Sequence, residues 1–320
     1  MMNNKLKIAF VMGMSLLLIQ IAKATPDTLI YYMKDAGYPV FNKDSGDYYR
    51  FVMSPDTNVD KNLYIVQEFY KSGKPKKYAT SINRDIFLRL EGSSISFFEN
   101  GHRKEIANYS NGKLKGEVTK YYPNGKLYSV EKFDGEEEDH RYIECHDSLG
   151  NVLATDGHGK WVFFDIDQKK NNISGSIING LENGEWSGSI GDTVKFSCLM
   201  KKNHVVSGTG YDKTGKAYPF TQMKVEPAFK RGLNDFYSYI QENMVIAARK
   251  KQNFLGGRVD ITFVVNSDGK LCSLKVLNAP NKTLGEMVYN VVKSSPPWKP
   301  GKILGIPTQF RYTIPVSYYY

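Results

Sequence analysis

The sequence predicts an α+β protein. It should consist of a two-layer C-terminal domain of order α-β-β-α-β with a small antiparallel sheet, preceded by a mostly-β repeat region of stacked hairpins. Residues 227–320 combine helical apolar stripes, an alternating strand and turn signals in one compact unit. Residues 64–226 repeat an aromatic–glycine phrase, and the 22 Tyr and 17 Phe of the chain favour strands. A chain of 320 residues is long enough for two domains.

The first 24 residues have the pattern of a secretory signal peptide. Lys5 and Lys7 precede an apolar run over residues 8–21, and Ala22-Lys-Ala24 follows as a cleavage signal. We expect cleavage before Thr25, which places the mature chain in the periplasm or cell envelope, with residues 25–63 as an N-terminal lead-in. The alternative is a retained inner-membrane anchor, for which this apolar run is short.

Residues 64–226 carry a recurring phrase in which two aromatic residues shortly precede a glycine. It occurs as Phe69-Tyr-Lys-Ser-Gly73, Phe97-Phe-Glu-Asn-Gly101 and Tyr121-Tyr-Pro-Asn-Gly125, the last two 24 residues apart. Tyr109-Ser-Asn-Gly-Lys113 and Phe133-Asp-Gly135 mark further turns at half that period. Asn-Gly between short aromatic or β-branched runs indicates a hairpin, because the turn needs positive φ. Each unit is therefore expected to be a hairpin that stacks on its neighbours.

This phrase resembles the MORN-like, antitoxin-type repeats of the YwqK-like group over about residues 64–190. The resemblance implies a structural spacer or a protein-binding sheet. The His and Cys residues fit no usual zinc spacing; they are His140, Cys145, His146 and His158. Of the three cysteines only Cys145 and Cys198 are a candidate disulfide, and half-buried thiols are the favoured alternative. We expect no catalytic site, no metal and no cofactor, and hence no enzyme.

The C-terminal unit should open with a helix at Pro227 whose apolar positions form one stripe: Phe229, Leu233, Phe236, Tyr237, Ile240 and Met244. Residues 259–265 alternate between apolar and polar side chains, and Asn266-Ser-Asp-Gly269 turns the chain into a hairpin partner over residues 271–277. Thr283-Leu-Gly-Glu286 has the pattern of a capping box and should start a second helix. The face of that helix is expected to carry Leu284, Met287, Val288, Val291 and Val292. Pro296-Pro297 ends it, and residues 307–317 should form the last strand.

Residues 227–320 resemble the TonB C-terminal domain family in its Bacteroidetes form. The motifs that carry the resemblance are Gly257-x-Val, the Asp268-Gly269 turn, Leu284, Pro297-Trp-Lys-Pro-Gly301 and Ile314-Pro-Val316. The usual Tyr-Pro after the first helix is replaced by Met244-Val-Ile-Ala. The resemblance implies periplasmic residence and docking of a short receptor segment as an added strand, because an edge strand offers unpaired backbone groups.

The resemblance places partner binding on the final strand. The residues expected to bind the partner are Gln309, Phe310, Arg311, Tyr312, Thr313 and Ile314. A basic contact surface of Lys299, Lys302 and Arg258 should attract an acidic partner. Core packing is the alternative interpretation for Trp298, Phe310 and Tyr312.

Charge separates the two parts of the chain. Residues 227–320 hold 13 Lys/Arg and 5 Asp/Glu, whereas residues 25–226 are almost neutral. An acidic partner surface fits this balance. Nucleic acid does not, because no recognition helix or stacking motif accompanies the charge.

We therefore expect a periplasmic TonB-like protein that docks onto an outer-membrane TonB-dependent receptor in support of transport. One alternative is a membrane-anchored energy transducer that keeps its leader helix. Another is an envelope scaffold that binds peptidoglycan or another protein.

Overall fold

A computed structural model describes residues 27–135, 140–165, 170–191, 193–248 and 256–318. The predicted signal peptide lies outside the described residues. The chain divides into two compact units, one of residues 1–160 with 177–180 and the other of residues 161–176 with 181–320. This division falls within the repeat region and not at residue 226. No helix in the described ranges is long and apolar enough to cross a membrane.

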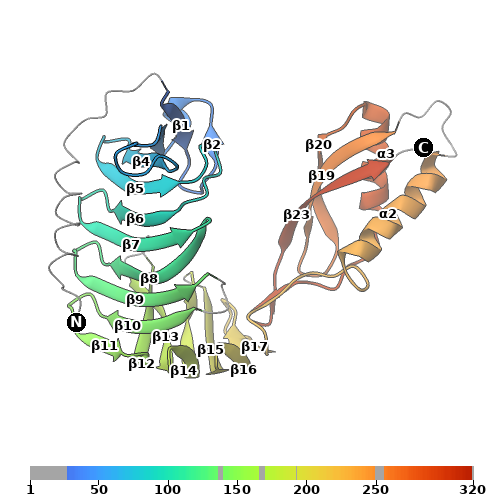
Figure 1. Ribbon diagram of the computed structural model, residues 1–320. Coiled ribbons are helices and arrows are strands. Elements are labelled where there is room, and N and C mark those ends of the chain that lie inside the picture. Colours follow the sequence, from blue (N-terminus) through green and yellow to red (C-terminus); the bar gives the residue numbers. More distant parts are fainter. Residues whose placement is uncertain (1–26, 136–139, 166–169, 192, 249–255, 319–320) are drawn as a thin grey trace. The chain divides into compact units, whose positions relative to one another are not determined.

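The first unit is a series of antiparallel strands joined by short turns (Figure 1). Strand β3 pairs with β1 and β4, and from β4 onward each strand pairs with the next as far as β12. The sheet thus begins before the repeat phrase, within the predicted lead-in. The elements are β1 (Leu29–Met33), β2 (Pro39–Val40), the 3₁₀ turn η2 (Lys43–Ser45), β3 (Tyr48–Met53), β4 (Tyr64–Tyr70), β5 (Pro75–Ser81), β6 (Gly92–Phe97), β7 (Arg103–Ser110), β8 (Lys113–Tyr121), β9 (Leu127–Asp134), β10 (Arg141–His146), β11 (Val152–Thr155) and β12 (His158–Asp165).

The predicted turns close these hairpins. Gly73, Gly101 and Gly125 have φ values of 81°, 92° and 84°, which only glycine adopts without strain. Each donates its N–H to the carbonyl of the aromatic residue three positions earlier, at 2.8–2.9 Å. Asn111 and the glycine after it are both at positive φ, as a two-residue type I′ hairpin turn requires. This unit thus contains antiparallel hairpins, and neighbouring hairpins pair edge to edge in one continuous sheet.

Side chains of one turn also bind the next turn. The Tyr70 hydroxyl donates to the carbonyl of Phe97, 27 residues on, and the Tyr122 hydroxyl to that of His146, 24 residues on. Asn124 donates its side-chain amide to the Ser148 carbonyl in the same way. The Tyr and Asn positions of the phrase therefore make hydrogen bonds from one turn to the next, and these bonds reinforce the backbone ladder that joins neighbouring hairpins.

The second unit begins within β12, at residue 161, and holds the C-terminal domain and the later strands except residues 177–180, which belong to the first unit. Strands β14 to β17 pair consecutively in antiparallel fashion, and β18 forms a small sheet with β21 and β22. The elements are β13 (Lys170–Ile178), β14 (Leu181–Ile190), β15 (Val194–Lys201), β16 (His204–Tyr211), β17 (Ala217–Phe220), β18 (Lys224–Val225), α2 (Leu233–Ala248), β19 (Gly257–Val265), β20 (Leu271–Asn278), α3 (Lys282–Lys293), β21 (Lys302–Ile303), β22 (Ile306–Pro307) and β23 (Phe310–Tyr318).

The C-terminal domain has the predicted order α-β-β-α-β. Its sheet runs β20-β19-β23, with α3 packed on β19 and β20, α2 packed on β23, and the two helices in contact with each other. One core joins both layers, and its least exposed members include Phe236, Ile240, Ile261, Phe263 and Val288, each at 0% exposure. Burying aliphatic and aromatic side chains of this size contributes about 1.5–3 kcal/mol each. The predicted face of α3 is buried in full.

The first helix starts later than predicted. It begins at Leu233 and not at Pro227, because Ala228 instead exchanges two backbone hydrogen bonds with Lys299 and the chain turns at Gly232, whose φ is 148°. Phe229 is still in the core at 1% exposure, whereas Leu233 is 37% exposed and does not belong to the stripe.

The predicted starts of the second helix and of the last strand were also wrong. The cap of α3 is Asn281, whose side-chain oxygen accepts from the backbone N–H of Leu284 at 2.8 Å; a capping box at Thr283 would start the helix two residues later. The last strand begins at Phe310, because the Thr308 N–H bonds the Gly301 carbonyl and separates β22 from β23.

Candidate docking edge

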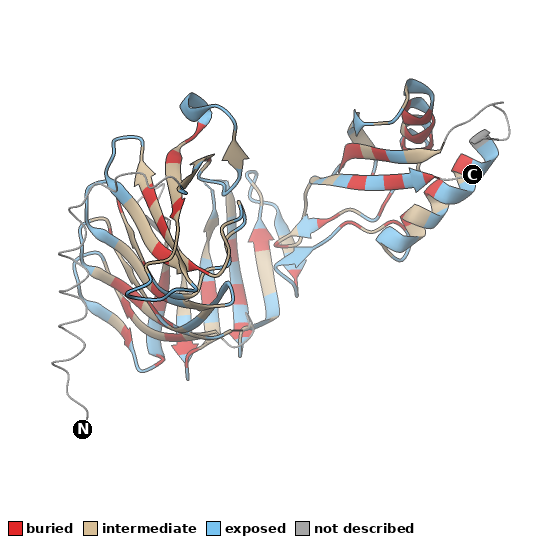
Figure 2. Ribbon diagram, turned by 45° about the horizontal axis from the view of Figure 1, so that its top comes forward, coloured by how far each residue is buried: buried red, intermediate tan, exposed pale blue. Residues whose placement is uncertain are grey.

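Strand β23 is the outermost strand on one side of the C-terminal sheet. It pairs with β19 over nine residues, from Phe310 opposite Val265 to Tyr318 opposite Gly257, without any shift of register. Its side chains alternate, so that Ile314 and Val316 are buried while Thr313 and Pro315 are exposed (Figure 2). The described part of the chain places no strand beyond β23.

Three observations fix which backbone groups of β23 face away from β19. Pro315 has no N–H, and a proline within a sheet lies with its nitrogen on the unpaired side. Gln241 of α2 donates its side-chain amide to the Ser317 carbonyl at 2.8 Å, so that carbonyl also faces away from β19. Conversely, the Thr262 hydroxyl of β19 donates to the Tyr312 carbonyl at 2.9 Å. Since successive residues of a strand point to opposite sides, the odd-numbered residues face outward.

Between Arg311 and Pro315 the outward edge therefore offers two donors and three acceptors. The donors are the N–H groups of Arg311 and Thr313, and the acceptors are the carbonyls of Arg311, Thr313 and Pro315. Gln241 covers the next carbonyl, that of Ser317, and ends the free segment on that side. The free edge thus spans Arg311–Pro315, which is enough for a short extended peptide.

The opposite edge of the sheet, β20, is less suited to strand addition. Its register with β19 shifts twice, and Ser273 within it has a φ of 55°. Bulges of this kind twist an edge away from pairing. β23, which has no such shift, is the regular edge of this sheet.

The structure separates the predicted strand residues into two groups. Arg311 and Thr313 are exposed, and their backbone groups face outward. Tyr312 and Ile314 face the helices: Tyr312 stacks on Phe263 with ring centroids 5.8 Å apart, and Ile314 is 3% exposed. Phe310 is half-buried at the start of the strand, and Gln309 lies before it, outside β23. Gln309 is therefore not an edge residue.

The predicted basic surface is not one patch. Arg258 lies on β19 opposite Ser317, six residues along the ladder from Arg311, which is about 20 Å at 3.3 Å per residue. Its guanidinium pairs with Asp260 at 2.9 Å. Lys302 lies in β21, which pairs with β18 and β22, and Lys299 pairs through its backbone with Ala228. Among the predicted basic residues, only Arg311 is on the docking edge.

The Tyr312 side chain has a polar partner, Glu226, near the start of β23. Its hydroxyl donates to Glu226 Oε2 at 3.3 Å, and Glu226 also pairs with Lys224. Burial and the Glu226 charge raise the pKa of Tyr312 to about 12. The hydroxyl is therefore a neutral donor at physiological pH and joins the segment before the domain to the start of β23. Sequence reasoning had no signal for this contact, because Glu226 is 86 residues away.

The Pro-Trp-Lys-Pro-Gly motif is structural. Trp298 is 3% exposed and lies among Phe229, Phe236 and Phe263, with ring centroids 4.7–5.8 Å from its own. Its backbone N–H donates to the carbonyl of Gly269 at 2.8 Å, and a Cβ on Gly269 would lie 2.0 Å from the Trp298 carbonyl oxygen. The Trp298 backbone can therefore approach the turn this closely only because residue 269 is a glycine. Trp298 is a core residue, as the alternative interpretation had it.

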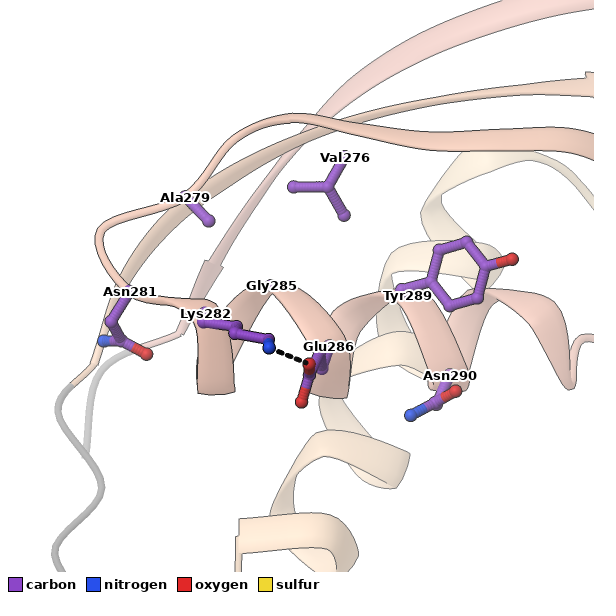
Figure 3. Close-up of a pocket in the computed structure, with 8 residues that line it drawn as sticks. All are labelled: Val276, Ala279, Asn281, Lys282, Gly285, Glu286, Tyr289 and Asn290. Carbon is purple, nitrogen blue, oxygen red and sulfur yellow. Dashed lines mark ion pairs between the residues drawn. The ribbon is translucent and has the colours of Figure 1, made fainter.

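A second concave surface lies between β20 and α3 (Figure 3). It encloses about 700 Å³, with Val276 and Ala279 on one wall and α3 residues, including Tyr289, on the other. The absence of a side chain at Gly285 leaves space in this groove, since a Cβ there would lie 3.2 Å from the Cβ of Ala279. The ion pair of Lys282 and Glu286 crosses its rim at 3.8 Å. This groove is on the bulged side of the sheet, away from β23.

The histidines of the repeat region have separate partners. His140 Nε2 bonds Glu131 Oε2 at 2.9 Å, and its ring stacks on Phe133. His146 bonds Glu144 at 2.7 Å. Burial raises the pKa of Glu131, but the hydrogen bond from His140 and the charge of Lys120 lower it further, to about 2. These side chains stabilise the sheet, and within the described ranges no group of three metal-ligating side chains gathers.

The candidate disulfide does not form. Cys145 and Cys198 are both buried, and neither is part of a disulfide. Burial raises the pKa of the Cys198 thiol to about 11, so it stays protonated at neutral pH.

Comparison with known proteins supports the C-terminal resemblance. Residues 247–320 match the family described as Gram-negative bacterial TonB protein C-terminal. No curated protein matches the chain. The matched residues contain both edge strands, the central strand and α3. The C-terminal domain is thus similar to the C-terminal domain of bacterial TonB proteins.

Proposed function

We propose that this protein docks an extended segment of an outer-membrane TonB-dependent receptor along β23, in the periplasm, in support of transport. The observation that carries the proposal is the regular free edge at Arg311–Pro315, within a domain that matches the TonB C-terminal family. Strand addition takes its affinity from backbone hydrogen bonds and so tolerates variable partner sequences.

The expected affinity follows from the number of free backbone groups. Five outward groups allow about five hydrogen bonds, each contributing about 0.5–1.5 kcal/mol net. Side-chain contacts with Arg311 and Thr313 add to this sum, and association entropy subtracts from it. The sum corresponds to weak binding, with a dissociation constant for the free segment in roughly the high micromolar to millimolar range.

Charge supports an acidic partner. Arg311 is exposed at the edge, and the domain carries an excess of eight basic residues. Exposed charges of this kind mainly raise the association rate and are screened by salt. We therefore expect binding to slow and weaken as ionic strength rises.

The repeat region is proposed as a spacer or protein-binding sheet that presents this domain. Its turn-to-turn hydrogen bonds make a regular stack with no catalytic arrangement apparent in the described residues. A cleaved leader would leave docking without force transmission, because an energy transducer needs a membrane anchor. N-terminal sequencing of the purified protein separates these cases: a chain that begins at Thr25 excludes the anchored transducer.

Peptide binding tests the partner class. The full chain is titrated with peptides from the N-terminal segments of the host's outer-membrane TonB-dependent receptors, and separately sedimented with purified peptidoglycan. The proposal predicts saturable peptide binding. Sedimentation with peptidoglycan in the absence of any peptide binding would favour the envelope scaffold instead.

A further inference from the structure

A small pocket in the first unit combines buried charge with an apolar wall. It encloses about 240 Å³ between strands β3 to β5 and the loop of residues 82–90. The charged residues that line it are Arg50, Glu68 and Lys77, and the apolar ones include Val66, Phe87 and Leu90. Pockets for drug-sized ligands occupy about 300–1,000 Å³, so this one suits a smaller molecule.

The floor of the pocket is a buried ion pair with spare bonding capacity. Arg50 Nε donates to Glu68 Oε1 at 2.7 Å, and the two side chains are 13% and 6% exposed. Arg50 also donates to the Ile86 carbonyl at 3.0 Å, which ties the loop to the sheet. Glu68 Oε2 accepts no hydrogen bond from any described residue. Glu68 Oε2 is not among the fully buried polar atoms without a partner, and Glu68 lines the pocket, so a ligand donor can reach this oxygen.

Lys77 supplies the complementary charge. It lies directly opposite Glu68 in the β4–β5 register and is half-buried. No acidic side chain in the described ranges comes within ion-pair distance of it. The Lys77 ammonium is therefore available to bind an anion, while Glu68 keeps one carboxylate oxygen, Oε2, that Arg50 does not occupy.

The loop contributes the apolar side chains Ile86, Phe87, Leu88 and Leu90 to the lining of the pocket. The Asn83 side chain accepts from the Arg89 N–H at 2.7 Å and donates to the Phe87 carbonyl at 3.1 Å, which closes the loop from within. Phe87 of this loop is 76% exposed to solvent. An exposed aromatic ring on a loop fixed in this way indicates a contact surface for an apolar ligand group.

We propose that this pocket binds a free apolar α-amino acid of about the size of leucine. The ligand ammonium would donate to Glu68 Oε2, its carboxylate would accept from Lys77, and its side chain would pack on Phe87 and Leu90. A peptide end carries only one of the two charges within this reach, so the free amino acid is the better fit.

Calorimetric titration of the full chain with L-leucine tests the proposal. It predicts saturable binding that Lys77→Met weakens about tenfold or more, while Lys115→Met, at an exposed position on β8, leaves it unchanged. Two analogues probe the charges separately: 4-methylpentanoate lacks the amino group and 3-methylbutylamine lacks the carboxylate, and each should bind about tenfold more weakly than leucine.

Phe87→Ser changes only an exposed side chain and should also weaken leucine binding, so the test does not depend on altering the buried Glu68. Absence of leucine binding at millimolar concentration, or equal binding by the Lys77→Met variant, would overturn the proposal. So would equal binding of leucine and both analogues, since that would show an apolar pocket with no role for the charges.

Discussion

The substitution Thr313→Pro isolates one outward donor of the docking edge. The Thr313 N–H faces away from β19, so its removal leaves the β19–β23 ladder intact. Proline fits an edge strand when its nitrogen is on the unpaired side, as Pro315 already is. The variant should therefore fold as the parent does while losing one of its two outward donors.

The loss in binding follows from one hydrogen bond. A net backbone bond contributes about 0.5–1.5 kcal/mol, and the partner's carbonyl is left without its donor. We expect the dissociation constant for a receptor peptide to rise about three- to tenfold. Pro315→Thr is the matched control, because it adds an outward N–H two residues along the same edge and should leave binding equal or tighter.

Calorimetry of both variants with the tightest-binding receptor peptide gives the readout, and circular dichroism confirms that each is folded. If Thr313→Pro, folded, binds as tightly as the parent, docking does not use this edge. If Pro315→Thr weakens binding as much as Thr313→Pro does, backbone donors are not the cause.

Three further predictions concern stability. Glu131→Gln should lower the free energy of unfolding at pH 7 by about 3 kcal/mol, because the pKa of Glu131 is lowered from 4.5 to about 2. The stabilisation by this carboxylate is present above pH 4.5 and is lost as the pH falls toward 2, so denaturant melts of the variant should vary less over that window; parallel pH profiles of parent and variant would refute it. Gly269→Ala should cost more than about 2 kcal/mol in a denaturant melt, since its φ is 83° and a Cβ would strike the Trp298 carbonyl; a loss below about 0.5 kcal/mol would contradict the close approach. Asn281→Ala should cost about 1 kcal/mol through the lost cap, while Asn290→Ala in the same helix should not, and equal losses would argue against capping.

Much of the C-terminal domain could be predicted from the spacing of apolar residues along the sequence. The order of elements and the buried face of α3 follow from helical and strand periodicity, which reports burial directly. The start of α2 did not follow, because the bridge from Ala228 to Lys299 joins residues 71 apart and replaces a helical turn. Phe229 fitted the apolar stripe of the predicted helix because its ring is in the core. It reaches the core from a turn that precedes α2.

The repeat phrase predicted hairpins but not the reason for its spacing. Tyr70 and Tyr122 are fixed by hydrogen bonds to the following turn, which no single-turn pattern shows. The sheet also starts at Leu29, where no repeat phrase exists.

The position of the free sheet edge was predicted only in part. The resemblance placed it on the last strand, but which backbone groups face outward depends on Pro315 and on Gln241 of a distant helix. The basic residues were grouped by type and by closeness in sequence, whereas Arg258 is neutralised by Asp260 and lies far along the ladder. A count of charged residues does not show which of them form ion pairs, as Arg258 does with Asp260.

Amide hydrogen exchange of the full chain, with and without a bound receptor peptide, tests the docking edge most directly. Binding should slow exchange at the amides of Arg311 and Thr313, because their outward N–H groups become donors to the added strand. Protection confined to β20 or to the groove beside α3, with Arg311 and Thr313 unchanged, would contradict it.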